Sequence, residues 1–300
     1  MNSPFQTVVG IVCGALMLLA GGSSGQQAPA GRPDQPPVIV QPVTFGILLV
    51  KGGSGANSGL IIGNKEVIAV DAKMSPESTQ AALAELKKTI PFPVTRIILT
   101  HSDADHVNGL PGFPKGLAII SHEQVKADLV KAAETQPALL DYLPTVTFKD
   151  ELKLKSGRTK ILLKHFGPAH TSGDIVVFLD ADRTAYVGDL VFAGRDPLIH
   201  RSKNGTSSGL VKTLKALLSH RPHIDTFIPG HGDILTRTEV GNEIRDIEVK
   251  QSKIKTLIAE GKSLDEIKKI LQVEDRPGAG GRPRFMSLVE VIYLELTEKK

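Results

Sequence analysis

From Val38 onward, short apolar runs alternate with breaks rich in Gly, Pro and Asn, which is typical of strands joined by turns. Residues 38–53, VIVQPVTFGILLVKGG, and residues 58–72, SGLIIGNKEVIAVDA, have the β-branched content of strands. Asn64-Lys65 separates two apolar runs, so we expect a tight hairpin there. Residues 94–100, VTRIILT, predict a further short strand that ends directly before His101.

Helices are predicted where a capping residue precedes apolar positions at helical spacing. Ser75-Pro76 supplies an N-cap and a first-turn proline. Ser121 with Gln124 predicts a capping box for a second helix, and residues 208–219 predict a third. The apolar positions that share one face of the first helix are Leu83, Leu86 and Ile90.

The second half of the chain repeats the mixture. Four more strands are expected, at residues 159–166, 174–180, 184–189 and 224–230. Two β-rich blocks flanked by helices indicate an α/β fold with layered architecture. We therefore place one domain at residues 38–235.

The segment at residues 236–300 has a different pattern, and we interpret it as a helical C-terminal extension packed on the main domain. Ser263 with Glu266 caps one helix, residues 276–284 form a Pro/Gly-rich loop, and residues 286–297 form a last helix. A helical stripe precedes them, made of Val240, Ile244, Ile247, Ile254 and Ile258.

The N-terminus has the pattern of an export signal. Residues 7–20 are apolar and uncharged, and the Pro/Gly/Gln-rich residues 21–37 follow them. The apolar run suits a signal-peptide core better than a membrane-spanning helix, although no Lys or Arg precedes it. We expect residues 1–30 to be signal peptide and linker, and the mature protein to be periplasmic or secreted with no stable membrane span. A disordered N-terminal extension is the alternative.

Composition excludes several classes of function. The formal net charge is only +4, Trp is absent and Tyr occurs three times, so neither a basic stripe nor stacking platforms for nucleic acid are present. The single cysteine, Cys13, leaves no thiolate metal site in the rest of the chain. Any metal must be bound by His and carboxylates. We expect a small-molecule substrate and no nucleic-acid partner.

Residues able to bind metal occur where predicted strands end. The segment Thr100–His106, THSDADH, follows one strand and holds four of them. Three further segments also place a potential metal ligand at the end of a predicted strand, with Gly nearby to permit close backbone approach. The candidate residues are His101, Asp103, Asp105, His106, His170, Asp189 and His231. The remaining histidines lack this local sequence context, and we expect them to be structural or exposed. They are His122, His165, His200, His220 and His223. Asp174 is expected to cap a turn.

These motifs, in this order, resemble the metallo-β-lactamase superfamily, whose pattern is His-x-His-x-Asp-His, then His, Asp and His. The resemblance covers roughly Val38 to Leu235 and implies an αββα four-layer sandwich with two metal ions at one edge of the sheets. It assigns His101, Asp103 and His170 to a first site, and Asp189 to a bridge. The second site would consist of Asp105, His106 and His231.

Asp103 departs from the family pattern, which has His there. We expect two divalent ions, most favourably zinc, with manganese or iron competitive at the site that contains Asp103 because a carboxylate is a harder ligand than imidazole. The resemblance implies a bridging hydroxide, oriented by Asp105 as the catalytic carboxylate, that attacks an ester, thioester or lactone-like bond. Arg195, Arg201 and Lys203 could attract a small anionic substrate or be solvated charges.

With Asp189 at the bridging position, the chain resembles hydrolases of the glyoxalase-II (hydroxyacylglutathione hydrolase) type. The β-lactamases of the superfamily tend to have Cys or Ser at that position, and often a Lys shortly afterwards. Leu-Val-Phe follows Asp189 in this chain, which disfavours antibiotic hydrolysis as the main activity. Alternatives are β-lactam hydrolysis, a single-iron persulfide dioxygenase, and a non-enzymatic exported metal-binding protein. A nuclease is disfavoured by the missing basic patch.

Overall fold

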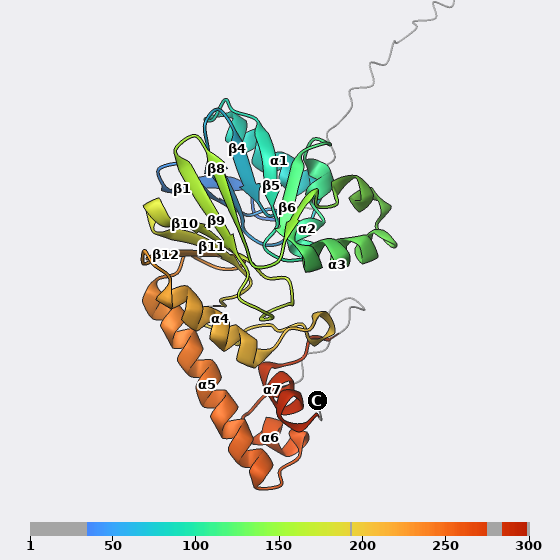
Figure 1. Cartoon of the computed structure of the whole chain (residues 1–300). Helices are drawn as coiled ribbons and strands as arrows, with labels where there is room; N and C mark the ends of the chain where they lie inside the picture. The colour runs from blue at the N-terminus through green and yellow to red at the C-terminus, as the bar shows by residue number, and fades with distance from the viewer. Residues whose placement is uncertain (1–34, 193, 275–283, 299–300) are drawn as a thin grey trace, which may run out of the picture. The chain divides into compact units, whose positions relative to one another are not determined.

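Two β-sheets pack face to face with helices on both outer surfaces (Figure 1). The computed structural model describes residues 35–192, 194–274 and 284–298. The predicted signal peptide lies outside these residues, as does most of the predicted loop at 276–284. Within the described residues, no helix has both the length and the apolar content needed to cross a membrane.

The first sheet has seven strands in sequence order, antiparallel from β1 to β4 and parallel from β4 to β7. Its strands are β1 (Ile39–Thr44), β2 (Ile47–Lys51), β3 (Ser58–Ile62), β4 (Val67–Val70), β5 (Val94–Ile98), β6 (Ala118–His122) and β7 (Val146–Phe148). The predicted hairpin joins β3 to β4, with Lys65 in the left-handed region at φ 58°. That prediction is confirmed.

The second sheet has five strands in the order β12-β11-β10-β9-β8. Only the β11–β12 pair is parallel. Its strands are β8 (Glu151–Ser156), β9 (Thr159–Lys164), β10 (Val176–Leu179), β11 (Thr184–Gly188) and β12 (Thr226–Pro229). Since β11 and β12 run the same way, the residues that follow them emerge at the same edge.

Seven α-helices surround the sheets in the described part of the chain. They are α1 (Pro76–Lys87), α2 (Ala104–Val107), α3 (Glu123–Ala133), α4 (Ser207–Ser219), α5 (Arg237–Ala259), α6 (Leu264–Ile270) and α7 (Leu288–Thr297). Ser75 caps α1 and Ser263 caps α6 with Glu266, as predicted. The cap of α3 differs from the prediction: the His122 side chain accepts the N–H of Gln124, because Ser121 lies inside β6 and its hydroxyl donates to the His122 carbonyl.

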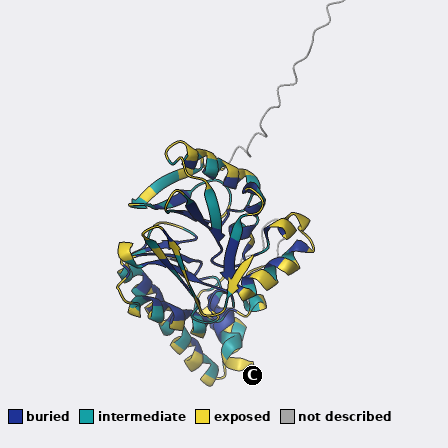
Figure 2. Ribbon diagram, turned by 45° about the horizontal axis from the view of Figure 1, so that its top comes forward, coloured by how far each residue is buried: buried dark blue, intermediate teal, exposed yellow. Residues whose placement is uncertain are grey.

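Three apolar clusters separate four layers, which confirms the αββα architecture. The central cluster fills the space between the sheets, with Leu49, Ile68 and Ile98 on one side and Leu163 and Val177 on the other. A second cluster joins the first sheet to α1 and α3, and a third joins the second sheet to α4 and the C-terminal helices. Figure 2 shows buried positions along the sheets and on the inner sides of the helices.

The C-terminal helices are part of the third cluster. Ile254 of α5, Ile267 of α6 and Val291 of α7 are buried with Leu210 and Leu214 of α4. Burying five such side chains contributes roughly 1.5–3 kcal/mol each. The helices after residue 236 therefore share a core with the second sheet, while the division into domains at 38–235 and 236–300 stays a prediction.

Candidate metal centre

Strand ends bring the candidate side chains to one edge of the two sheets. His101 follows β5 of the first sheet, while Asp189 directly follows β11 and His231 comes two residues after β12. His170 lies in the loop between β9 and β10. Asp105 and His106 belong to the short helix α2. The structure thus gathers all seven predicted residues in one cluster.

Asp105, His106 and His231 form one group whose potential ligand atoms lie within 4.8 Å of one another. Nε2 of His231 lies 3.1 Å from Oδ2 of Asp105, and Nε2 of His106 lies 4.0 Å from the same oxygen. This is the set predicted for the second site. His106 is fully buried, whereas the side chains of Asp105 and His231 are 23% and 33% exposed. The group is accessible to a small molecule on that side.

Asp189 lies between this group and its neighbour. Its Oδ1 is 3.1 Å from Nε2 of His106, and its Oδ2 is 3.3 Å from Nε2 of His231. Asp189 also belongs to a second group with His101 and His170. The rings of His101 and His106 are 4.1 Å apart between centroids, so the two groups are adjacent. One carboxylate therefore faces both, as a bridging ligand would.

The environment of Asp103 differs from the prediction in one respect. Its Oδ2 lies 3.1 Å from Nε2 of His170 and 3.9 Å from Nε2 of His101, the expected partners. Nε2 of His200 is closer, at 2.7 Å, and Asp103, His170 and His200 form a third group able to bind a cation. His200, expected to be a structural or exposed residue, thus lies beside the predicted ligands. It lies 97 residues beyond Asp103 on the segment between β11 and α4, so local sequence carries no signal of this contact.

The donor atoms fit divalent cations. Buried polar groups normally find hydrogen-bond partners, and the cost of leaving one unpaired is about 1–3 kcal/mol. Five buried side-chain polar atoms in the described residues lack such a partner, and four belong to this cluster. They are Nε2 of His101, His106 and His200, and Oδ1 of Asp189. Imidazole nitrogens and carboxylate oxygens that converge in this way are the ligand set that zinc and similar ions prefer.

The other ring nitrogens of these histidines are held by the protein. Nδ1 of His106 lies 2.7 Å from Oδ2 of Asp71, and Nδ1 of His170 lies 2.7 Å from the carbonyl oxygen of Leu198. Nδ1 of His101 contacts the Thr100 hydroxyl at 3.0 Å. Each contact fixes ring orientation and leaves Nε2 for a metal. Sequence reasoning missed Asp71, although it too stands at a strand end, directly after β4.

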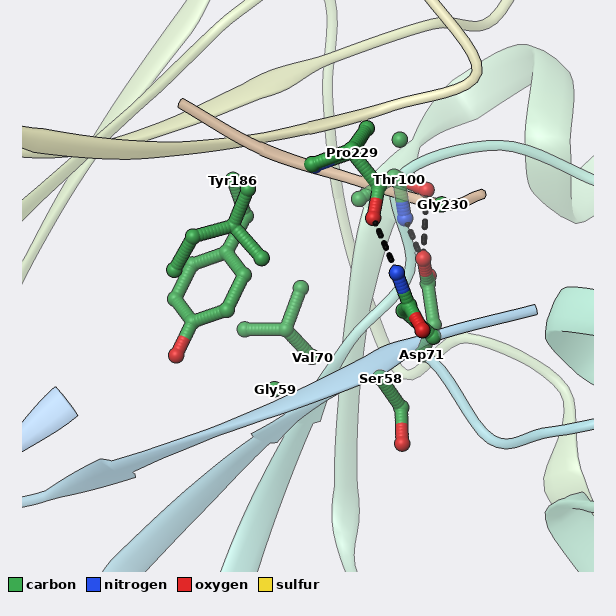
Figure 3. Close-up of a pocket in the computed structure, with 11 residues that line it drawn as sticks. Ser58, Gly59, Val70, Asp71, Thr100, Tyr186, Pro229 and Gly230 are labelled. Atoms are coloured by element: carbon green, nitrogen blue, oxygen red, sulfur yellow. Dashed lines mark hydrogen bonds between the residues drawn. The ribbon is translucent and has the colours of Figure 1, made fainter. Parts of the chain in front are cut away.

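Asp71 also ties two strands together behind the site (Figure 3). Its Oδ1 accepts the backbone N–H of Thr100 at 2.8 Å, and its Oδ2 accepts the Thr100 hydroxyl at 2.7 Å. Nearby, the Asn57 side chain donates to the carbonyl oxygens of Pro229 and Gly232, at 3.1 and 2.9 Å. A cavity of about 10 Å³ lies between these residues, room for about one water molecule. These contacts hold the ends of β5 and β12 in place.

Gly230 is required by close packing against the ligands. A Cβ atom at this position would lie 2.1 Å from Oδ1 of Asp189 and 2.6 Å from Cε1 of His106. No side chain other than hydrogen fits at such distances. Any larger residue would displace Asp189, His106 or the backbone that carries His231.

The electrostatics of the metal-free cluster are those of coupled acids and bases. Burial lowers the pKa of His170, but its hydrogen bond to Asp103 and the nearby carboxylates more than offset this, and the pKa is raised to about 9. Hydrogen bonds that His231 donates to Asp105 and Asp189 likewise raise its pKa to about 9. Burial would raise the pKa of Asp189, yet the charge of His106 and contacts with His106 and His231 hold it well below its usual range. The carboxylates are therefore ionised and available as ligands.

The three basic residues that could attract substrate or be solvated charges have different environments. Arg201 pairs with Glu298, and Nζ of Lys203 lies 2.8 Å from Oδ1 of Asp103. Arg195 is exposed, and its guanidinium lies 4.5 Å from the ring centroid of Phe192. Phe192 in turn stacks on His231, with centroids 6.0 Å apart and planes 14° from parallel. Of the three, Arg195 is the one beside the accessible side of the cluster.

A cavity of about 410 Å³ adjoins this position. Residues 194–197 line one side, and residues of α5, all but one of them polar, line the other. The α5 residues are Glu239, Asn242, Glu243, Asp246, Ile247 and Lys250. Its size is within the range of small-ligand sites. Burial raises the pKa of Glu243 to about 7, so that side chain is partly protonated at neutral pH.

Asp174 and the other histidines lie outside the ligand groups. Oδ1 and Oδ2 of Asp174 accept the hydroxyl and backbone N–H of Thr171, which confirms the predicted turn cap next to His170. Nδ1 of His165 contacts the carbonyl oxygen of Asp174 at 2.7 Å. His220 lies 2.8 Å from Asp180, and His223 is exposed.

Comparison with known proteins decides the family. A sequence profile of the Metallo-beta-lactamase superfamily matches residues 52–258, more than half of the chain. The chain belongs to the metallo-beta-lactamase superfamily. The matched region runs from the start of the glycine-rich turn after β2 to the end of α5 and includes every ligand candidate. Superfamily membership agrees with a hydrolase built on His and Asp clusters able to hold divalent metal.

Three curated relatives are named either metallo-beta-lactamase or alkylsulfatase. A metallo-beta-lactamase type 2 of Bacillus sp. (strain 170) is 26% identical over 185 residues, 61% of this chain and 69% of that protein. A protein of the same name from Bacillus cereus is 25% identical, covering 61% and 70%. A linear primary-alkylsulfatase of Pseudomonas sp. (strain ATCC 19151) is 35% identical over 79 residues, only 26% of this chain and 14% of that protein.

Solved structures agree on the fold. A metallo-beta-lactamase from Pontibacter korlensis superposes with a TM-score of 0.59 at 16% identity, covering 70% of this chain and 99% of that one. A double mutant of a sec-alkyl sulfatase gives a TM-score of 0.65 at 14% identity, covering 87% and 50%. At these identities the likeness concerns the fold alone.

Proposed function

We propose that this protein is a two-metal hydrolase that cleaves an ester, thioester or lactone-like bond in a small anionic substrate. One observation carries the proposal. Asp189 lies between two adjacent groups of His and Asp side chains, and Nε2 of His101, Nε2 of His106 and its own Oδ1 are buried there without hydrogen-bond partners. A pair of divalent ions at such a centre acidifies water and polarises a carbonyl oxygen. Zinc suits the imidazole-rich set.

The residues have distinct roles in this proposal. Asp105, His106 and His231 bind the second metal and Asp189 faces both sites. The Asp105 carboxylate contacts His231 through Oδ2 and is partly exposed. Its other oxygen can accept a hydrogen from an attacking water and hold that water against the substrate. Cys13, outside the described residues, is the only cysteine, and no serine or lysine nucleophile is required.

Substrate binding is assigned to the side of the cluster where His231 is partly exposed. The buried Phe192 ring stacks on His231, and the exposed Arg195 guanidinium lies over the Phe192 ring. Arg195 supports an anionic substrate, whereas the acidic residues of the neighbouring cavity favour a polar, uncharged or cationic part of the same molecule. Arg195→Ala should raise KM for an anionic substrate about tenfold and leave kcat within about twofold, because a charge remote from the reacting bond contributes to binding alone.

A panel of chromogenic substrates tests the proposal. The protein loaded with zinc, manganese or iron is assayed against a thioester, a lactone, a carboxylic ester, a phosphodiester and a primary alkyl sulfate. Turnover of the thioester, lactone or ester that disappears on chelation supports the proposal. Metal-dependent turnover confined to the sulfate or phosphodiester would contradict the acyl-bond assignment, and no turnover with any metal would contradict an enzyme.

β-Lactam hydrolysis is a second candidate. It is favoured by the two curated relatives from Bacillus, which are named metallo-beta-lactamases. Each aligns with about three fifths of this chain. Asp189, followed by Leu190, Val191 and Phe192, argues for the broader hydrolase type as in the sequence interpretation. A chromogenic cephalosporin in the same panel separates the two. A kcat/KM for it above that of every ester and thioester would make the second candidate the main activity.

A further inference from the structure

The side chain of His200 is directed at the first metal site from a segment outside the superfamily motifs. Its Nε2 lies 2.7 Å from Oδ2 of Asp103, yet it has no hydrogen-bond partner of acceptable geometry. The ring is 4.9 Å from that of His170 between centroids, and its side chain is only 14% exposed. A buried imidazole nitrogen that approaches a carboxylate without pairing with it is arranged as if both faced a third atom.

We infer that His200 is a ligand of the first metal and supplies the imidazole that the superfamily pattern has at position 103. The first site then consists of three imidazoles, His101, His170 and His200, with Asp103 as a fourth, oxygen ligand. The inference rests on the proposed two-metal function and adds one ligand, His200, that the sequence pattern does not name.

The distances around Asp103 agree with one shared cation. Its Oδ2 lies 2.7, 3.1 and 3.9 Å from the Nε2 atoms of His200, His170 and His101. In a tetrahedral zinc site with bonds of about 2.0–2.1 Å, neighbouring ligand atoms are about 3.3 Å apart. The three observed distances bracket that value. Oδ2 of Asp103 is therefore one vertex of a set into which a single ion fits.

Lys203 explains why a carboxylate is tolerated at this position. Its Nζ lies 2.8 Å from Oδ1 of Asp103, and it also donates to the hydroxyl and carbonyl oxygens of Ser102 at 3.0 and 3.1 Å. The ammonium group neutralises one oxygen and leaves the other, Oδ2, facing the imidazoles. We assign Lys203 as a positioning residue for Asp103, not as a site for substrate.

The backbone holds His200 in register with His170. The N–H of His200 donates to the carbonyl oxygen of His170 at 2.9 Å, and Nδ1 of His170 contacts the carbonyl oxygen of Leu198. The backbone N–H of Ser172 donates to the carbonyl oxygen of Lys203 at 2.9 Å. The backbone N–H of Thr206 donates to the carbonyl oxygen of Ala169 at 2.8 Å. Two loops far apart in sequence are thus joined as one ligand-bearing unit. Such preorganisation is what a metal site requires.

Zinc binding to variants of the full-length protein tests the inference without reference to activity. Metal-free wild type and His200→Ala are titrated with zinc against a chromophoric chelator, with circular dichroism as the check of folding. Wild type should bind two ions. In His200→Ala one ion should bind about 100-fold more weakly or not at all, because a direct ligand matters more than the outer contacts that alter affinity 10–100-fold.

His220→Ala is the matched control. His220 has a similarly buried side chain, 11% exposed against 14% for His200, but pairs with Asp180 away from the cluster. It should bind two ions as wild type does. Asp103→His in the His200→Ala background rebuilds the superfamily imidazole and should restore most of the lost affinity. Lys203→Ala should weaken the first site about tenfold, and Lys203→Arg should recover part of it.

If His200→Ala does not fold, the number of zinc-bound imidazoles in the wild-type protein can be counted by NMR spectroscopy instead. In zinc-loaded wild type with 15N-labelled histidine, long-range 1H–15N correlation spectra distinguish metal-bound imidazole nitrogens. Five bound imidazoles are expected, and four would overturn the inference, as would two wild-type zinc sites in His200→Ala. A wild-type protein that binds no zinc would instead contradict the proposed function, so the two failures are distinguishable.

Discussion

Nδ1 of His106 lies 2.7 Å from Oδ2 of Asp71, a residue at the end of a different strand and 35 positions earlier in the chain. Both side chains are buried, at 0% and 4% exposed. Burial lowers the pKa of His106, but the charges of Asp189 and Asp71 outweigh it and raise the pKa well above the ordinary range. The contact selects the tautomer and orientation in which Nε2 faces the metal.

Asp71→Asn should therefore weaken zinc binding at the second site about 10–100-fold while affecting the first site less. Competitive zinc titration measures both. Asp174→Asn is the matched control, since Asp174 likewise accepts a backbone N–H and a hydroxyl, from Thr171, but has no imidazole among its side-chain hydrogen-bond partners. Equal loss of second-site affinity in the two variants would show that a buried carboxylate matters here for folding alone.

His231→Ala and Asp189→Ala should each lower kcat/KM by about 100-fold or more on whichever substrate is turned over. Both remove a side chain that contacts the second group, and Asp189 also contacts the first. Steady-state kinetics with metal analysis of the same samples provide the measurement. Near-wild-type turnover together with full metal content in either variant would show that its residue is not a ligand.

Removal of metal should destabilise the fold. Without a cation, the cluster leaves four buried polar atoms without hydrogen-bond partners, and a ligand that binds only the folded state stabilises it by mass action. Chelation should lower the Tm by about 5 °C or more, and added zinc should reverse the change. The double variant His106→Ala, Asp189→Ala should show little response to either treatment. A wild-type Tm that is unchanged by chelation would contradict the prediction.

Glu243 should make stability depend on pH. Burial raises its pKa from an ordinary value of 4.5 to about 7 in the folded protein, where the backbone N–H of Phe192 lies 3.4 Å from Oε1. Because the folded state binds the proton more tightly, the stabilising effect is present below pH 4.5 and is lost as pH rises to about 7. Glu243→Gln should thus raise the free energy of unfolding by about 2 kcal/mol at pH 8, allowing for solvent screening, and much less at pH 5. Denaturant unfolding at both pH values checks this, and equal differences at the two would argue against it.

Processing of the N-terminus remains a proposal from sequence. The uncharged apolar residues 7–20 and the small residues that follow predict that the mature protein begins between about Gly22 and Gly31 and is exported. N-terminal sequencing of protein isolated from the native host should find such a start in the periplasm or medium. Intact Met1 in the cytosol would exclude export.

Much of the fold was predictable because its signals are local. The hairpin at Asn64-Lys65, the caps at Ser75 and Ser263, and the strand that ends before His101 each depend on a few adjacent residues. The residue that caps α3 was not predictable in this way. Ser121 and His122 are both able to cap the helix, and the position at which β6 ends determines that His122 does so.

Residues beyond the motifs were not predictable for a different reason. The contacts of His200 and Lys203 with Asp103 span 97 and 100 positions and depend on how the segment after β11 folds against the His170 loop. Neither residue belongs to a pattern with a fixed spacing. Asp71 had a partial signal, an acid at a strand end, but its role requires knowledge that β4 and β5 are neighbours.

Helix α7 also contacts the segment that carries His200. Glu295 accepts the N–H and hydroxyl of Ser207 at 2.6 and 2.5 Å, Glu298 pairs with Arg201, and the ring of Phe285, just before the helix, lies 5.4 Å from that of His200. If His200 binds metal, docking of the last helix and occupancy of the first site are thermodynamically linked. Each must then favour the other by the same free energy. A change near the end of the chain could thereby set metal affinity while every superfamily motif stays intact.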